Sequence, residues 1–122
     1  MPFLLFFLCV LKRRKHMAEN KFQEKLVKEL ETRFPGSIVL KNDPNYIQGI
    51  PDLTILYKNK WAALEVKDSE NAPHRPNQPY YVDLLDKMSF SRFIYPENKE
   101  EVLDELQRAL EPRRASRISK SK

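Results

Sequence analysis

Two carboxylates and one amine lie at the ends of two apolar segments within the stretch 49–67. Asp52 opens the first segment, and Glu65 and Lys67 close the second, after a polar turn at 58–60. Side chains alternate between the two faces of a strand, so Glu65 and Lys67 should share one face while their neighbours point into a core. Carboxylates gathered at the ends of buried strands need a partner and usually hold a hard divalent cation. The stretch therefore predicts a β-hairpin that carries a metal site.

Simpler roles exist for the same residues. Asp52 alone is typical of a turn residue that follows a proline, here Pro51. The trio could also form a structural ion pair, with Lys67 bound to Asp52 or Glu65 at a strand end. The metal site fails if the carboxyl groups at positions 52 and 65 are far apart or face opposite sides of the sheet.

Length and charge restrict the class of protein. The 122 residues are enough for one domain with a modest core. The formal net charge is +5, yet residues 17–111 hold all seventeen acidic residues and thirteen basic ones, which leaves this segment at −4. Residues 1–16 and 112–122 carry basic charge and no acid. Attraction to phosphate therefore has to come from local patches or from the tail.

Cysteine and histidine usage excludes several kinds of site. Cys9 is the single cysteine, so an internal disulfide is excluded and a cysteine-based zinc site is implausible. A reducing, cytoplasmic setting fits this usage. His16 and His74 are too few and too far apart in sequence to suggest a histidine-rich metal site.

The first sixteen residues match neither of two common membrane signals. The apolar run 2–11 is ten residues long, well short of the roughly 20 that a membrane-spanning helix needs. Basic residues follow this run, whereas a secretory signal has them before it. We therefore expect residues 1–16 to be an extension outside the fold, with a weak membrane-surface anchor as the alternative.

A first helix is predicted from Glu19 to about Arg33, where apolar residues recur at helical spacing. Glu19 lies near the middle of the apolar stripe, whereas Glu24 lies well away from it. A carboxylate on a buried stripe is unusual and suggests a role in a site. The alternative is a first-turn acid that the helix dipole favours. The stripe comprises Phe22, Leu26, Leu30 and Phe34.

Strand and helix patterns alternate along the rest of the chain, and residues 112–122 should form a basic disordered tail. The order predicts one domain over residues 17–111, an α/β fold with a small mixed four-stranded sheet flanked by helices. The expected elements are a strand at 37–40, the two hairpin strands, a helix from Asn77 or Gln78 to about 87, a strand at 90–95, and a helix capped by Asn98 that ends near 110. Their apolar stripes are Tyr81, Leu84, Leu85 and Met88 on one helix, and Val102, Leu103, Leu106 and Leu110 on the other.

The loop 68–77 and the start of the following helix supply further candidates for ligand contact. Arg75 could hold a phosphate, and a solvated loop charge is the alternative. His74 is a lone loop histidine and is not expected to be catalytic. Gln78 fits either a helix cap or a polar contact to the site opposite. Tyr80 and Tyr81 are interpreted as packing residues and not as base-stacking platforms.

These motifs, in this order of elements, resemble the PD-(D/E)xK nuclease superfamily. Within it, the chain is similar to the small stand-alone VRR-NUC-type nucleases of phages and bacteria, which are relatives of Holliday-junction resolvases. The resemblance rests on Gly49-Ile50-Pro51-Asp52, on Glu65-Val66-Lys67 thirteen residues after Asp52, and on a first helix that opens with Glu19. Gln78 falls where that group has a glutamine at the start of its second helix. The likeness covers about residues 18–110.

The resemblance implies a restriction-endonuclease-like core and a metal-dependent endodeoxyribonuclease that hydrolyses phosphodiester bonds, with branched or junction DNA as its substrate. It implies Mg²⁺ or Mn²⁺ as the ion. The implied metal ligands are Asp52, Glu65, the backbone carbonyl of Val66, and Glu19 through water. The implied catalytic residues are Asp52, Glu65, Lys67 and Glu19, and the expected substrate contacts are Gln78, Arg75 and Lys60.

The resemblance also implies a homodimer in the cytoplasm of a bacterial or phage-infected cell, without a membrane partner or small-molecule cofactor. Two other classes stay open. One is a catalytically silent DNA-binding or regulatory module that kept the fold. The other is a small metal-dependent phosphohydrolase, which would lack a phosphate-cradling loop because Gly36 and Gly49 are the only glycines and neither lies in a glycine-rich motif.

Overall fold

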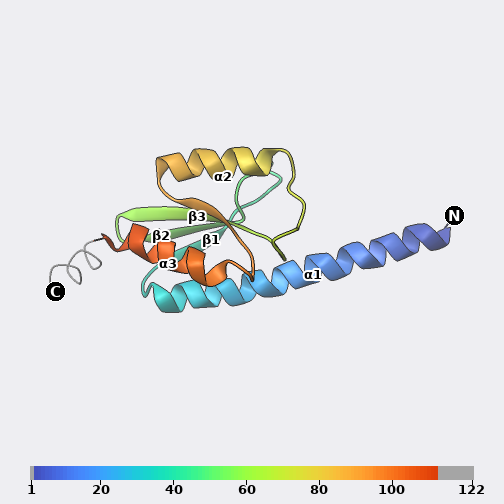
Figure 1. Cartoon of the computed structure of the whole chain (residues 1–122), viewed down its shortest axis with the longest axis horizontal. Helices are drawn as coiled ribbons and strands as arrows, with labels where there is room; N and C mark the ends of the chain where they lie inside the picture. Colours follow the sequence, from blue (N-terminus) through green and yellow to red (C-terminus); the bar gives the residue numbers. More distant parts are fainter. Residues whose placement is uncertain (1, 113–122) are drawn as a thin grey trace.

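A mixed four-stranded sheet separates helix α2 from helices α1 and α3 (Figure 1). The computed structural model describes the backbone of residues 2–112 and the side chains of residues 17–112. The order α-β-β-β-α-β-α and the layered α/β architecture confirm the fold class expected from the sequence. The elements are α1 (Pro2–Arg33), β1 (Ile38–Lys41), β2 (Leu53–Tyr57), β3 (Lys60–Val66), α2 (Asn77–Met88), β4 (Ser91–Ile94) and α3 (Lys99–Leu110).

The strands lie in the order β1-β2-β3-β4, so the hairpin strand β3 is internal. β1 and β3 both pair with β2 in the antiparallel direction, whereas β4 runs parallel to β3. The parallel pair requires a crossover, which α2 provides. The hairpin turn consists of Lys58 and Asn59, because Lys60 already pairs with Tyr57. Lys58 has a positive φ of 56°, as expected in so tight a turn.

The alternation of side chains divides the sheet into two different faces. Leu53 pairs with Leu64, and both point into the core beneath α1 and α3. Glu65 and Lys67 point to the opposite face, over which α2 lies. The core between the first face and the two helices includes Leu26, Leu30, Phe34, Ile55, Val66, Leu103 and Leu106.

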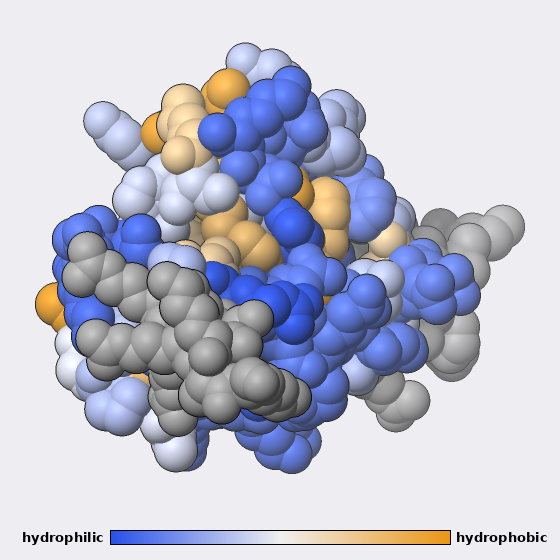
Figure 2. All heavy atoms as spheres, turned by 60° about the vertical axis from the view of Figure 1, so that its left-hand side comes forward, coloured by the Kyte–Doolittle hydropathy of each residue, from blue (hydrophilic) through white to orange (hydrophobic). Residues whose placement is uncertain are grey.

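α2 covers only part of the second face, because it packs against β3 and β4. Ile38 on β1 and Leu56 on β2 are paired neighbours and remain exposed there. Figure 2 shows apolar atoms reaching the surface around and below α2, at the top of that view, within an otherwise mostly hydrophilic face. The sheet thus has one face that is largely covered by α1 and α3 and one partly open face.

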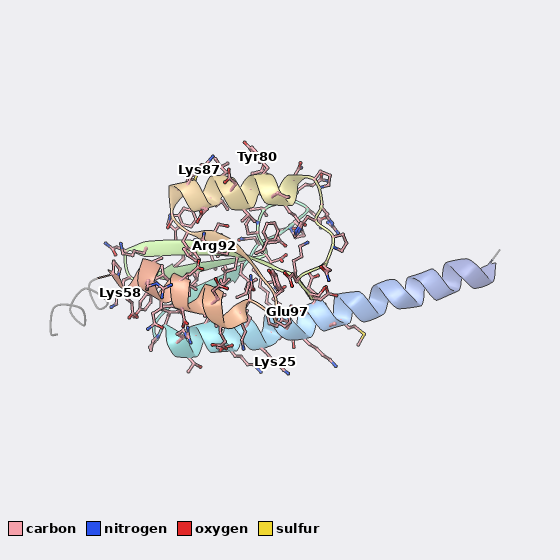
Figure 3. All side chains as sticks on the ribbon, in the orientation of Figure 1. Lys25, Lys58, Tyr80, Lys87, Arg92 and Glu97 are labelled. Atoms are coloured by element: carbon pink, nitrogen blue, oxygen red, sulfur yellow. The ribbon has the colours of Figure 1, made fainter. Side chains whose placement is uncertain are left out.

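Arg92 ties the helix layers together at the edge strand β4. Its guanidinium group bonds Asp86 of α2 and donates to Glu105 of α3, at 3.0 Å. Figure 3 shows Arg92 between these two helices. The Asp86 carboxylate also accepts the backbone N–H of Ser91. Because one strand residue engages both helices, α2 is fixed relative to the rest of the fold.

Helix α1 is longer than expected. Its stripe is confirmed, since Leu26, Leu30 and Phe34 are buried and Phe22 packs against the core. However, the helix begins at Pro2 and not near Glu19, and its first half projects beyond the sheet in Figure 1. Residues 3–34 contain no glycine or proline, so the sequence has no helix breaker between Pro2 and Pro35. The expectation that residues 1–16 are an extension outside the fold stays a prediction. The expected basic tail, residues 112–122, lies almost wholly outside the residues that the structure describes.

Helices α2 and α3 span nearly the residues that the sequence predicted, but only α3 buries its predicted apolar stripe in full. All four expected residues of the α3 stripe are buried. On α2, however, the buried residue is Val82, whereas Met88 is 63% exposed. Met88 is the last residue of the helix, after which the chain turns back toward β4. Within residues 2–112, none of the helices combines the length and apolar character that a membrane span requires.

Asn98 precedes α3 as expected, but its side chain does not cap the helix. It accepts the Tyr95 N–H at 2.8 Å and donates to the Phe93 carbonyl at 3.0 Å. Asn98 therefore stabilises the turn between β4 and α3.

Two glycines adopt left-handed backbone conformations, and only one of them is confined by its surroundings. Gly36 (φ +86°) has open space where a Cβ would lie. Gly49 (φ +91°) approaches the first residue of α2 so closely that an added Cβ would be 2.4 Å from the Cβ of Asn77. The Asn77 side chain also donates to the Gln48 carbonyl at 3.5 Å. The loop before Asp52 is thus packed against the start of α2.

Replacing each glycine by alanine should separate backbone strain from steric contact. Gly36→Ala should lower the free energy of unfolding by about 1–2 kcal/mol, the cost of a left-handed residue with a side chain. Gly49→Ala should cost more, because the backbone of Asn77 must also move. Urea unfolding of the two variants beside the parent chain measures the difference. Equal losses would contradict the close packing of the loop against α2.

Candidate active site

The carboxyl groups of Asp52 and Glu65 meet at one end of the hairpin. Asp52 immediately precedes β2, and because Leu53 pairs with Leu64, it lies across from Glu65 on the same face of the sheet. Its Oδ2 accepts the backbone N–H of Val66 at 2.9 Å, which fixes the carboxylate toward β3. The condition on which the metal-site hypothesis depended is therefore met.

Asn42 holds the chain that leads into Asp52. Its side chain donates to the Pro51 carbonyl at 2.8 Å and to Thr54 Oγ1 at 2.8 Å. Its backbone N–H donates to the Asp52 carbonyl, also at 2.8 Å. Sequence reasoning missed Asn42, because an asparagine in a polar loop is too common to single out.

Lys67 is buried beside this pair, and its ammonium group is held by neutral acceptors. The residue is 6% exposed. Its Nζ donates to Gln78 Oε1 at 2.7 Å and to the Pro73 carbonyl at 3.2 Å. Among the described side chains, no carboxylate lies within ion-pair distance of Lys67. The direct ion pair that the simpler interpretation requires is thus not formed here.

Gln78 connects the amine to one of the carboxylates. Its Oε1 accepts from Lys67 and from the Arg75 N–H, the latter at 2.8 Å, while its Nε2 donates to Glu65 Oε1 at 3.3 Å. Gln78 therefore contacts the site opposite and is not a side-chain cap of α2. These hydrogen bonds within the protein occupy the Gln78 side chain, which the sequence analysis expected to contact substrate.

The expected basic contacts are not all near this cluster. The Arg75 side chain is exposed on the loop that precedes Gln78, so it lies at the rim. Lys60 begins β3 whereas Glu65 is near its end, and the whole strand spans about 20 Å. Lys60 is therefore too distant for the assigned role beside the site, and Figure 3 shows Lys58 at the same far end of the sheet.

Glu19 approaches the cluster from α1 as a third acid. It is half-buried, and its charge is among those that raise the pKa of Glu65, although it is the weakest of these causes. Among the described residues, however, no three Asp, Glu, His or Cys side chains form a group that could hold a metal ion directly. The direct carboxylate ligands would thus be Asp52 and Glu65, with Glu19 farther out.

Glu65 is the most electrostatically constrained group of the cluster. It is 1% exposed, and no N–H or O–H group of the described residues donates to its buried Oε2. Burial raises its pKa from 4.5 to about 10, helped by a hydrogen bond to the Asp52 carboxyl and by the Asp52 charge, while the Lys67 charge lowers it. Without a cation, Glu65 therefore keeps its proton at neutral pH. A hard cation would satisfy the same oxygens, so the residues present fit a metal ion.

The rings of His74 and Phe93 pack against each other next to the cluster, a contact that the sequence analysis did not predict. Their ring centroids are 4.3 Å apart. Phe93 pairs with Glu65 in the parallel ladder, so this pair of rings lies next to the buried carboxyl group. His74 thus packs against an aromatic ring, and the expectation that it has no catalytic role stays a prediction.

The raised pKa of Glu65 predicts a pH dependence of stability in the metal-free protein. Between about pH 4.5 and 10 the folded state retains a proton that the unfolded state has lost, so stability should fall as pH rises. One proton corresponds to at most about 1.4 kcal/mol per pH unit. Urea unfolding in EDTA from pH 5 to 9 should show this slope, and Glu65→Gln should flatten it.

Glu24→Gln is the matched control for this measurement. Glu24 is exposed on α1, and its replacement should leave the slope unchanged. Identical slopes in the parent chain and in Glu65→Gln would show that Glu65 does not hold the proton.

Comparison of the chain with models of protein families, with curated proteins and with solved structures found no match. What the cluster does has to be inferred from its own geometry: two carboxyl groups that meet, an orphan oxygen, and a buried amine one residue past the strand.

Proposed function

We propose that this chain is a metal-dependent endodeoxyribonuclease that hydrolyses phosphodiester bonds, with branched or junction DNA as its substrate. The observation that supports the proposal most is the meeting of Asp52 and Glu65 on one face, with Glu65 buried and Lys67 linked to it through Gln78. A buried carboxyl group beside a half-buried one, without a direct ion pair, is costly for the fold alone. A site for a hard cation accounts for that cost.

The residues present divide into metal ligands and a catalytic amine. Asp52, Glu65 and the Val66 carbonyl would hold Mg²⁺ or Mn²⁺, with Glu19 contributing through water. The ion would supply an activated water near neutral pH and compensation for negative charge on the phosphoryl oxygens. Lys67 would orient the attacking water and stabilise the charge that builds up in the transition state.

The hydrogen bonds of Lys67 suit that role. Two neutral acceptors, Gln78 Oε1 and the Pro73 carbonyl, hold the ammonium group without cancelling its charge. A catalytic group positioned before the substrate binds does not have to be ordered during the reaction. Gln78 is thus proposed as a positioning residue, since it contacts both Lys67 and Glu65.

Charge and symmetry bear on how DNA would be bound. The segment 17–111 carries a net charge of −4, so its affinity for DNA should depend on the metal, on Arg75 and on basic residues elsewhere. Phosphate contacts of this kind weaken steeply with salt. A four-way junction presents two equivalent strands for cleavage, and we propose a homodimer because a chain of this size cannot reach both.

A silent DNA-binding module with the same fold is the second candidate. The intact set of Asp52, Glu65 and Lys67 favours the nuclease, because a protein that only binds DNA has no need of a buried amine next to paired carboxyl groups. Such a module would bind branched DNA and leave it uncut in the presence of Mg²⁺.

Lys67→Ala should lower the rate of strand cleavage by on the order of a hundredfold or more. Labelled junction, flap, single-stranded and duplex DNA, incubated with Mg²⁺, Mn²⁺ or EDTA, provides the assay. Lys60→Ala is the matched control, because it removes the same charge at the far end of β3 and should leave the rate constant unchanged. Cleavage in EDTA, or full activity of Lys67→Ala, would overturn the mechanism.

Two α1 variants test which acid joins the site. Glu19→Gln should slow cleavage by about tenfold to a hundredfold, as expected for a group that acts through a ligand or water. Glu24→Gln, on the exposed side of the same helix, should cleave like the parent chain. The reverse pattern would show that the wrong acid of α1 has been assigned.

A further inference from the structure

The loop that leads from β1 to Asp52 displays an exposed aromatic ring. Tyr46 is 86% exposed, the most of any large hydrophobic residue described, and the neighbouring Ile47 is also exposed. We propose that Tyr46 is a stacking platform for an unpaired nucleobase of the substrate, next to the phosphate to be cleaved. This inference rests on the proposed function and specifies its substrate class: nucleic acid with an unpaired nucleotide at the cleavage site.

The loop is held in shape before any ligand binds. The Tyr46 N–H donates to the Asp43 carbonyl at 3.2 Å, and the Asn45 N–H donates to Asp43 Oδ1 at 2.8 Å. The Ile50 N–H donates to the Ile47 carbonyl at 3.3 Å. These turns present the Tyr46 side chain outward on a fixed backbone, so stacking on it would cost little loop ordering.

Both ends of the loop are tied to the proposed catalytic cluster. At one end, Asn42 bonds the backbone of Pro51 and Asp52. Near the other, the Gln48 carbonyl accepts from Asn77, the residue before Gln78. Two residues of chain span at most about 7 Å, so the Tyr46 backbone lies within that distance of Gln48. Tyr46 therefore belongs to a loop that is bonded to residues next to the cluster at both ends, and its ring is exposed there.

The chemistry of the ring favours an unpaired base as its ligand. Every nucleobase has a π-face, and stacking on an exposed tyrosine is tolerant of sequence. A base inside a duplex already stacks on its neighbours and has no free face, whereas a base in a single strand, a flap or an open junction does. Tyr80, interpreted as a packing residue, does pack edge to face against Tyr81, with ring centroids 5.1 Å apart, but it is also 62% exposed. Figure 3 shows, however, that Tyr80 is on the outer side of α2, away from the sheet.

Fluorescence of 2-aminopurine, an adenine analogue that is quenched on stacking, tests the assignment. The probe is placed in a single strand, at the first unpaired position of a flap, and at a paired position of a duplex. Binding is measured in EDTA and in Ca²⁺, and cleavage with Mg²⁺ is followed on the same oligonucleotides. The parent chain should quench the single-stranded and flap probes and leave the paired probe unchanged.

The variants are Tyr46→Ala, Tyr46→Phe and Tyr80→Ala. Tyr46→Ala should lose the quenching and bind unpaired DNA about fivefold or more weakly. Tyr46→Phe retains the ring and should restore both. Tyr80→Ala is the control for an exposed tyrosine away from the cluster and should behave as the parent chain. Equal losses in the two alanine variants would overturn the inference, as would unchanged binding and quenching in Tyr46→Ala.

The inference and the proposed function can fail separately. Quenching that depends on Tyr46, in a chain that cuts none of the oligonucleotides, would support the stacking site and contradict the nuclease. Cleavage that is the same in the parent chain and in Tyr46→Ala, without quenching, would support the nuclease and overturn the stacking site. A Tyr46→Ala change in oligomeric state without a change in DNA binding would also overturn it, because the ring would then serve a contact between copies of the chain.

Discussion

The meeting of two carboxyl groups at the end of a buried hairpin is the constraint around which this structure is arranged. Asp52 is fixed toward Glu65 by the Val66 N–H, and Glu65 is buried by the sheet and α2. Two adjacent carboxylate charges are unfavourable without compensation. The proton on Glu65 supplies it in the metal-free protein, and a divalent cation would supply it in the proposed enzyme. In the proposed enzyme, metal binding would therefore displace the proton of Glu65.

The amide of Gln78 holds Lys67 and Glu65 close together without a direct ion pair between them. If Lys67 paired directly with Glu65, its charge would cancel that of the carboxylate, and the attraction for a cation would weaken. Gln78 instead accepts from the amine and donates to the carboxyl group. Both remain close, and neither is neutralised by the other. The position of α2 therefore matters, and Arg92 helps to fix it by engaging Asp86 and Glu105 on opposite helices.

The sequence predicted those parts of the site that follow from strand periodicity. The two-residue repeat of a strand was enough to place Glu65 and Lys67 on one face. The register of the hairpin was not predicted, because the turn is one residue shorter than the expected 58–60 and Lys60 pairs with Tyr57. Features that depend on how separate elements dock were less accessible. The contact of Lys67 with the Pro73 carbonyl could not be predicted, because any residue has a backbone carbonyl. The burial of Val82 depends on how α2 is rotated against β3 and β4. Lys60 was assigned to the site without regard to the length of β3.

In the proposed enzyme, the loop before Asp52 would link substrate recognition to chemistry. Asn42 bonds the chain on both sides of the Pro51–Asp52 peptide, and Gly49 touches Asn77 where no side chain would fit. Any displacement of the loop would therefore be passed to Asp52 at one end and to the start of α2, which carries Gln78, at the other. A ligand that stacks on the loop without moving it leaves the carboxyl pair aligned. A rigid loop with an exposed ring is better suited to this requirement than a flexible one, because binding energy is not spent on ordering the residues that hold the metal ligands.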